Sequence, residues 1–180
     1  MVRAEESSIS TVCATIEDYY NDHKHLKSAI LNSLLVKLQI IIGREYLKAF
    51  ESRRLNFHNY GERLTAAEQL KQEADMLKNL FQRLMNKNAD EVEASYIEYV
   101  SSILIAASDI LSLRDKSLLA LEVSSFVQKF PEVKVDQLTG IILCREDIGR
   151  SDGRQLAQDI ISQNRFRETK DNEFSVVFHT

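Results

Sequence analysis

Apolar residues recur at intervals of three and four along almost the whole stretch from Ile9 to Ile161, and only one proline, Pro131, interrupts them. This spacing marks one face of an α-helix, which turns once about every 3.6 residues. Helices patterned in this way bury their apolar faces against one another. The pattern therefore predicts an all-α fold, an elongated antiparallel bundle of six to seven helices.

The first part of the chain predicts two helices that a polar break separates. One should begin near Ser8 or Ser10 and end at residues 21–25, which are polar. The other should cover residues 26–53, and Gly43 inside it could permit close packing. The predicted apolar face of the first helix comprises Ile9, Val12, Cys13, Ile16, Tyr19 and Tyr20. That of the second comprises Ile30, Leu34, Leu38, Ile41 and Ile42, widened by Leu31, Leu35, Tyr46 and Phe50. A helix so broadly apolar usually touches neighbours on two sides.

The third helix follows a turn at residues 56–61. Thr65 and Glu68 have the spacing of a capping box, so the helix starts there, or nearer Gly61 with these residues inside it. Its apolar residues form a heptad seam too short for an independent coiled coil. The seam comprises Ala67, Leu70, Ala74, Leu77, Phe81 and Leu84.

The remaining helices are shorter. A connection at residues 86–90 leads to a fourth, and Asp115 can cap a fifth that ends at Pro131. A short helix over residues 135–143 precedes a last one, which Ser151 or Asp152 can cap. The apolar residues of the fourth, fifth and last helices are Val92, Tyr96, Val100, Ile103, Ala107 and Ile110; Leu119, Val123, Phe126 and Phe130; and Leu156, Ile160 and Ile161.

The pattern lapses from Asn164, where a charged run precedes a segment of strand-like composition at residues 174–178. We therefore expect three regions. Residues 1–7 form a flexible N-terminus, residues 8–163 the helical bundle, and residues 164–180 a disordered or loosely docked tail.

Composition narrows the class of protein. The net charge is −4, from 23 basic and 27 acidic residues, which does not favour a nucleic-acid partner. No apolar run reaches the roughly 18 to 20 residues that span a bilayer, and the N-terminus lacks an apolar signal core. Cys13 and Cys144 lie among apolar neighbours, which favours buried reduced thiols over a disulfide. These observations fit a cytoplasmic protein.

The sequence shows no pattern that predicts a catalytic, cofactor-binding or metal site. Asp22, His23 and His25 could suggest a metal ion, but side chains two apart diverge on a helix, so a solvated helix end is favoured. Glu17 and Asp18 point about 100° apart and cannot share a proton. The sequence also lacks a GxGxxG motif, a P-loop and an HExxH motif. We therefore expect a protein that is not an enzyme.

One group of basic residues is a candidate site. It comprises Arg44, Lys48, Arg53, Arg54 and Arg63, around the end of the second helix. Such a cluster could contact a phosphoinositide or an acidic partner helix. A solvated face balanced by Glu45, Glu51 and Glu62 is the favoured alternative, because basic helix faces are common.

Three segments together resemble a known family. Residues 15–22 have the sequence TIEDYYND, and residues 44–49 have REYLKA and lead to the acidic and apolar run 68–84. Residues 119–133 have LALEVSSFVQKFPEV and continue through residues 138–142 to Arg145-Glu146-Asp147 and Ser151. Their order and spacing resemble the C-terminal region of exocyst complex component three, the Sec-six family, over roughly residues 12–163.

The resemblance implies a vesicle-tethering role in exocytosis. Members are helical rods that bind other exocyst subunits and SNARE-related proteins, at the plasma membrane or on secretory vesicles. A nanotube-associated branch, similar to the tumour-necrosis-factor-induced relative, is linked instead to a Ral-type small GTPase. Neither branch implies an activity or a cofactor. Members are several times longer than this chain, which would carry the last bundle or two of a rod, so we expect some apolar surface on the wide second helix to be left open.

Overall fold

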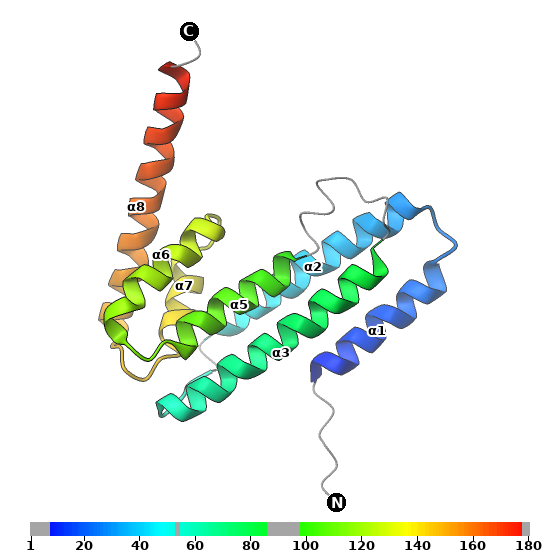
Figure 1. Cartoon of the computed structure of the whole chain (residues 1–180), viewed down its shortest axis with the longest axis horizontal. Coiled ribbons are helices and arrows are strands. Elements are labelled where there is room, and N and C mark those ends of the chain that lie inside the picture. The colour runs from blue at the N-terminus through cyan, green and yellow to red at the C-terminus, as the bar shows by residue number, and fades with distance from the viewer. Residues whose placement is uncertain (1–7, 53–54, 86–97, 178–180) are drawn as a thin grey trace, which may run out of the picture. The chain divides into compact units, whose positions relative to one another are not determined.

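The computed structural model describes the backbone of residues 8–52, 55–85 and 98–177, and the side chains of these residues up to residue 166. Within these ranges the chain is all-α and contains no strand, as predicted (Figure 1). The α-helices are α1 (Ser8–His23), α2 (Ser28–Glu51), α3 (Tyr60–Leu84), α5 (Tyr99–Ser112), α6 (Leu119–Lys129), α7 (Val135–Ile142) and α8 (Arg150–Val177). A 3₁₀ turn, η1 (Lys116–Leu118), precedes α6.

The helices contribute to two compact units. The first contains residues 1–46 and 69–105, and the second contains residues 47–68 and 106–180. Helices α2, α3 and α5 therefore each contribute residues to both units.

The first unit is built around the predicted seam of α3. Leu70, Ala74, Leu77, Phe81 and Leu84 are all buried, which confirms the heptad pattern there. Side-chain contacts and close packing join neighbouring helices of this unit. Arg83 of α3 pairs with Glu17 of α1 at 2.9 Å, and the Tyr46 hydroxyl of α2 donates to Glu73 of α3 at 2.6 Å. A Cβ built on Gly43 of α2 would lie 3.5 Å from Ile103 Cδ1 of α5, so these two helices pack closely, as Gly43 suggested.

The predicted apolar faces of α1 and α2 are partly wrong. Ile9 and Ile16 of α1 are buried, but Val12 is 40% exposed and Tyr19 is 65% exposed. In α2, the widening residues Leu31, Leu35 and Phe50 are buried, whereas Ile30, Leu34 and Ile41 of the predicted stripe are exposed. Where apolar residues surround a helix, its neighbours decide which arc is buried, and the spacing alone cannot.

Helix α7 belongs to the second unit, and its residues Leu138–Ile142 are buried. Helices α6 and α7 both pack against α8. A Cβ built on Gly140 of α7 would overlap the Phe50 carbonyl of α2 and lie 2.8 Å from the Glu51 nitrogen. Only glycine allows this approach between two helices. Most predicted core residues of this unit, including Leu119, Val123, Phe126, Phe130 and Ile160, are buried, whereas Leu156 is half-buried.

Helix ends follow local capping chemistry. The Asn59 side chain accepts a hydrogen bond from the Glu62 amide at 3.0 Å, and the Glu62 carboxylate accepts one from the His58 amide at 2.9 Å. This box starts α3 at Tyr60, so the alternative of a start near Gly61 is confirmed. Thr65 lies inside the helix and donates to the Gly61 carbonyl. Asp115 accepts a hydrogen bond from the Ser117 amide and caps η1 rather than α6.

The backbone of α8 extends further than the sequence pattern indicates. The periodic apolar pattern ends at Asn164, but the backbone is helical as far as Val177, and a disordered or loosely docked tail over residues 164–180 remains a prediction. Residues 165–173 contain Arg, Glu and Lys, which are good helix formers even where no apolar face is present. An established helix also adds residues more easily than a new one starts.

Both cysteines are free. Cys144 is buried, and burial raises the pKa of its thiol to about 12. Cys13 is only half-buried, and burial also raises the pKa of its thiol. Both groups are therefore protonated at neutral pH, as expected of packing residues.

Candidate functional site

The basic residues chosen from the sequence do not form one surface. Arg44 and Lys48 are exposed on α2. Arg53 and Arg54 lie outside the described residues. Arg63 is only 2% exposed, so its place in a lipid- or partner-binding cluster is wrong.

Arg63 is buried because it continues the α3 seam. It lies four residues before Ala67 and seven before Leu70, and therefore on the same helix face. Its guanidinium donates to the Leu113 carbonyl at 3.1 Å, and its Nε lies 3.0 Å from a Glu146 carboxylate oxygen. The guanidinium also stacks over the Tyr60 ring, 5.1 Å from its centroid. The burial of Arg63 could therefore have been predicted from the spacing of the seam, since Arg63 lies four residues before its first apolar residue, Ala67.

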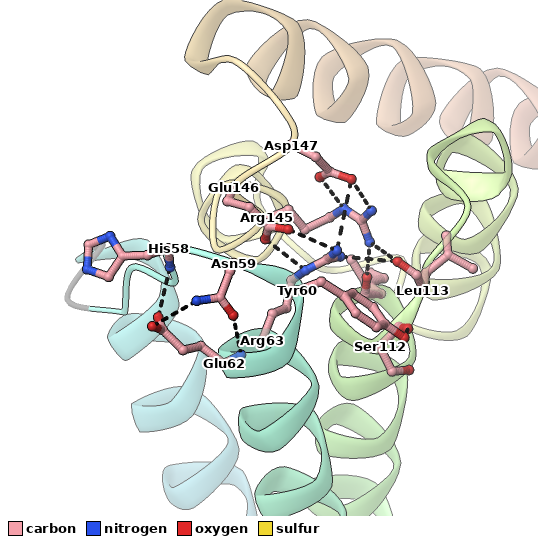
Figure 2. Close-up of polar contacts among 11 residues, drawn as sticks. His58, Asn59, Tyr60, Glu62, Arg63, Ser112, Leu113, Arg145, Glu146 and Asp147 are labelled. Atoms are coloured by element: carbon pink, nitrogen blue, oxygen red, sulfur yellow. Dashed lines mark hydrogen bonds and ion pairs between the residues drawn. The ribbon is translucent and has the colours of Figure 1, made fainter.

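A second buried arginine completes this polar cluster, which Figure 2 shows. Arg145 follows α7, is 2% exposed and donates to the carbonyls of Ile110 and Leu113, each at 2.8 Å. Its other nitrogens bind Asp147 in bidentate form, at 2.9 and 2.6 Å. Partial burial would raise the pKa of Asp147, but the hydrogen bonds and charge of Arg145 and the charge of Arg63 lower it.

This cluster is a structural device of the second unit. The last carbonyls of a helix have no partner within it. At the end of α5, Arg145 donates to the Ile110 carbonyl and the Tyr60 hydroxyl donates to the Ser112 carbonyl at 3.2 Å, while both arginines donate to the carbonyl of Leu113, which follows the helix. The pairing with Glu146 and Asp147 neutralises the two buried cations. Sequence reasoning assigned no role to Arg145, although a charged triplet directly after an apolar helix was the available signal.

An open apolar surface is present on α2, as expected. Ile30, Leu34 and Ile41 are 48%, 45% and 52% exposed. Successive residues of an α-helix are about 100° apart, so these three side chains fall within one narrow arc. This surface is the candidate binding site of the first unit.

The described residues were compared with the requirements of a membrane span and of a metal site. Among the described residues, no helix is both long and apolar enough to cross a membrane. Within the same ranges, no three His, Cys, Asp or Glu side chains are grouped so that they could hold a metal ion.

Comparison with known proteins gives a consistent family. Residues 4–150 match the family model described as exocyst complex component Sec6. Exocyst complex component 3 of Caenorhabditis elegans is 39% identical over 172 residues, which are 96% of this chain and 21% of that protein. The human exocyst complex component 3-like protein is 29% identical over 143 residues, 79% of this chain and 18% of that protein.

Exocyst complex component 3 of Drosophila melanogaster is 24% identical over 162 residues, 90% of this chain and 21% of that protein. The chain therefore spans about a fifth of the length of these relatives. No solved structure matches it.

Proposed function

The chain belongs to the exocyst complex component Sec6 family, and from this membership we propose that it is a non-enzymatic interaction segment of a vesicle-tethering subunit in exocytosis. The observation that carries the proposal is the family match over residues 4–150, together with an all-α fold that leaves apolar side chains open on α2. Its partners are other exocyst subunits and SNARE-related helices, which it contacts through extended helical faces. It acts in the cytoplasm, peripherally at the plasma membrane or on secretory vesicles.

Affinity capture tests this function. The chain is used as bait in cytosol beside a full-length relative of the same family, and bound proteins are identified by mass spectrometry. Recovery of exocyst subunits by both baits supports the proposal. If the full-length relative recovers them and this chain recovers none, the segment does not carry the interaction. Recovery of a Ral-type GTPase or actin regulators without exocyst subunits would place the chain in the nanotube-associated branch.

The exposed cations favour a second candidate, a peripheral phosphoinositide contact. Arg44 and Lys48 are exposed on α2, and Arg53 and Arg54 follow in the sequence. Arg63 does not contribute, because it is buried against Glu146 and Leu113.

Flotation with phosphoinositide vesicles tests this candidate. The variant Arg53→Gln/Arg54→Gln should lose binding, because each cation near an anionic surface contributes about 1 kcal/mol. The matched control Arg114→Gln/Arg154→Gln makes the same charge change elsewhere and should float like the wild type. Undiminished flotation of the Arg53→Gln/Arg54→Gln variant would contradict this assignment.

A further inference from the structure

The outward side of α2 combines aliphatic and basic residues. Ile30, Leu34, Lys37, Ile41 and Arg44 are all exposed and belong to the first unit. At about 100° per residue they fall within an arc of about 80°, and at about 1.5 Å per residue they extend over about 21 Å. We call these five residues the α2 face.

The α2 face differs from an ordinary solvated helix surface because three of its five residues are aliphatic. The side of α2 that points inward carries the polar residues Asn32 and Gln39, 3% and 0% exposed, beside the apolar Leu35. The Gln39 amide reaches only the Met85 sulfur, at 3.8 Å, and its carbonyl oxygen has no partner among the described residues. Polar groups are thus buried while three aliphatic side chains face outward. Aliphatic side chains exposed together in this way are expected where a partner covers the outward side.

The charged residues of the α2 face indicate which kind of partner surface would bind it. Lys37 and Arg44 are seven residues apart, so both lie at one edge of the apolar stripe. Neither forms an ion pair with a residue that the structure describes, although the chain as a whole has a net charge of −4. An apolar stripe with unpaired cations along one edge is complementary to a helix with Asp or Glu beside its own stripe.

We propose that the α2 face binds an amphipathic α-helix of another protein whose apolar stripe is bordered by acidic residues. This inference deepens the proposed function and rests on it for the class of partner. Ile30, Leu34 and Ile41 anchor the partner helix, and Lys37 and Arg44 fix its register.

Two other occupants fit less well. A second copy of α2 packed about a two-fold axis near Lys37 would set one Lys37 against the other, and like charges repel. A membrane surface usually requires four or more clustered cations, and amphipathic membrane helices usually insert aromatic residues. The α2 face has two cations and no aromatic residue.

A pair of synthetic peptides tests the inference. Each is a fluorescent peptide of three heptads with leucine at the two core positions, bordered by glutamate in one peptide and by lysine in the other. Fluorescence anisotropy should show that the wild-type chain binds the glutamate peptide, and that this binding weakens as salt screens the charges. Ile41→Glu should weaken it at least about tenfold, because the substitution places a charge in the apolar stripe.

Charge reversal provides the decisive comparison. Lys37→Glu/Arg44→Glu should lose about tenfold in affinity for the glutamate peptide and gain affinity for the lysine peptide. Both positions are exposed, so the variant should fold normally, which circular dichroism checks. The control Lys129→Glu/Lys134→Glu makes the same charge change at exposed positions of the second unit and should bind like the wild type.

Several results would overturn the inference. These are no binding of the glutamate peptide, equal binding of the two peptides by the wild type, or no change in the charge-reversed variant. Sedimentation showing a dimer that Ile41→Glu dissociates would assign the α2 face to a second copy. Flotation with 30% phosphatidylserine vesicles, abolished by Lys37→Glu/Arg44→Glu without any peptide binding, would assign it to a membrane.

The same variants separate this inference from the proposed function. If wild type and the charge-reversed variant capture exocyst subunits equally, the tethering function stands and the α2 face is not the site. If the wild type captures no exocyst subunit but the peptides follow the charge pattern, the α2 face stands and the proposed function falls.

Discussion

Arg63 and Arg145 are the two buried arginines of the polar cluster in the second unit. Each is 2% exposed, and each binds both a carboxylate and a main-chain carbonyl. Arginine suits this role because its planar guanidinium can bind a carboxylate in bidentate form while other N–H groups reach the helix end. A lysine at either position would supply the charge without this geometry.

Replacing Arg145 by methionine should lower the free energy of unfolding by about 3 kcal/mol, since Asp147 loses its bidentate partner and the Ile110 carbonyl of α5 loses its side-chain donor. Arg154→Met is the matched control, because Arg154 pairs with Asp136 at 3.5 Å and both side chains are more than half exposed. That change should lower the free energy of unfolding by less than about 1 kcal/mol. Urea denaturation of the variants measures both values, and equal losses would refute the role of the buried pair.

The same pair predicts a pH dependence. The pKa of Asp147 is lowered in the folded chain, so its contribution to stability is complete above the unfolded pKa of about 3.9. The contribution is lost as the pH falls from there through the lower folded pKa. Urea denaturation at a series of pH values from 7 to 2.5 should therefore show a steeper acid loss in the wild type than in Asp147→Asn. Parallel curves would show that Asp147 does not contribute.

At the scale of the element, two glycines lie where one helix packs closely against another. Gly140 of α7 faces the main chain of α2 at Phe50 and Glu51, which cannot move aside without unwinding a turn. Gly43 of α2 faces side chains of α5, and a methyl group there would make only ordinary contacts. One glycine is thus required by packing, and the other is merely compatible with it.

We therefore expect alanine to have opposite effects at the two positions. Gly140→Ala should lower the free energy of unfolding by about 2 kcal/mol or more, because the added methyl overlaps rigid backbone. Gly43→Ala should raise it by up to about 1 kcal/mol, because alanine is the better helix former. Thermal and urea unfolding of both variants tests this, and a stabilised Gly140→Ala protein would exclude the close approach.

At the scale of the whole molecule, the chain spans about a fifth of the length of these relatives. Its two units are assembled from helices that contribute residues to both. The disordered or loosely docked tail predicted for residues 164–180 remains a prediction. The backbone is helical to Val177, but the structure describes side chains only up to residue 166.

Deletion of residues 164–180 tests that prediction. A loosely docked tail buries little apolar surface, so its removal should change the free energy of unfolding by less than about 1 kcal/mol. Deletion of residues 157–180 is the control, because it removes the buried Ala157, Ile160 and Ile161 and should prevent stable folding. A loss of several kcal/mol on removing residues 164–180 alone would show that the tail is docked.

Much of this fold could be predicted because helices are local. The spacing of three and four residues gave the helices and most of the core, including the α3 seam from Ala67 to Leu84. Capping chemistry was harder to assign, because Asn59 with Glu62 and Thr65 with Glu68 have the same spacing and only the first pair lies at a helix start.

The candidate surfaces could be predicted only in part. An open apolar surface on α2 was expected, but the residues expected to be buried included Ile30, Leu34 and Ile41, which form it. Arg63 was assigned to the surface because it is charged, although its place in the seam put it inside.

The sequence by itself determined the all-α class, the order of the helices and the family, since periodicity and local motifs depend on neighbours along the chain. Only the tertiary structure decided which arc of α2 is buried and which glycine is indispensable. It alone also brought Arg63 and Arg145 to the end of α5. These features depend on residues far apart in the sequence, such as Phe50 and Gly140, and such contacts leave no periodic signal in either segment.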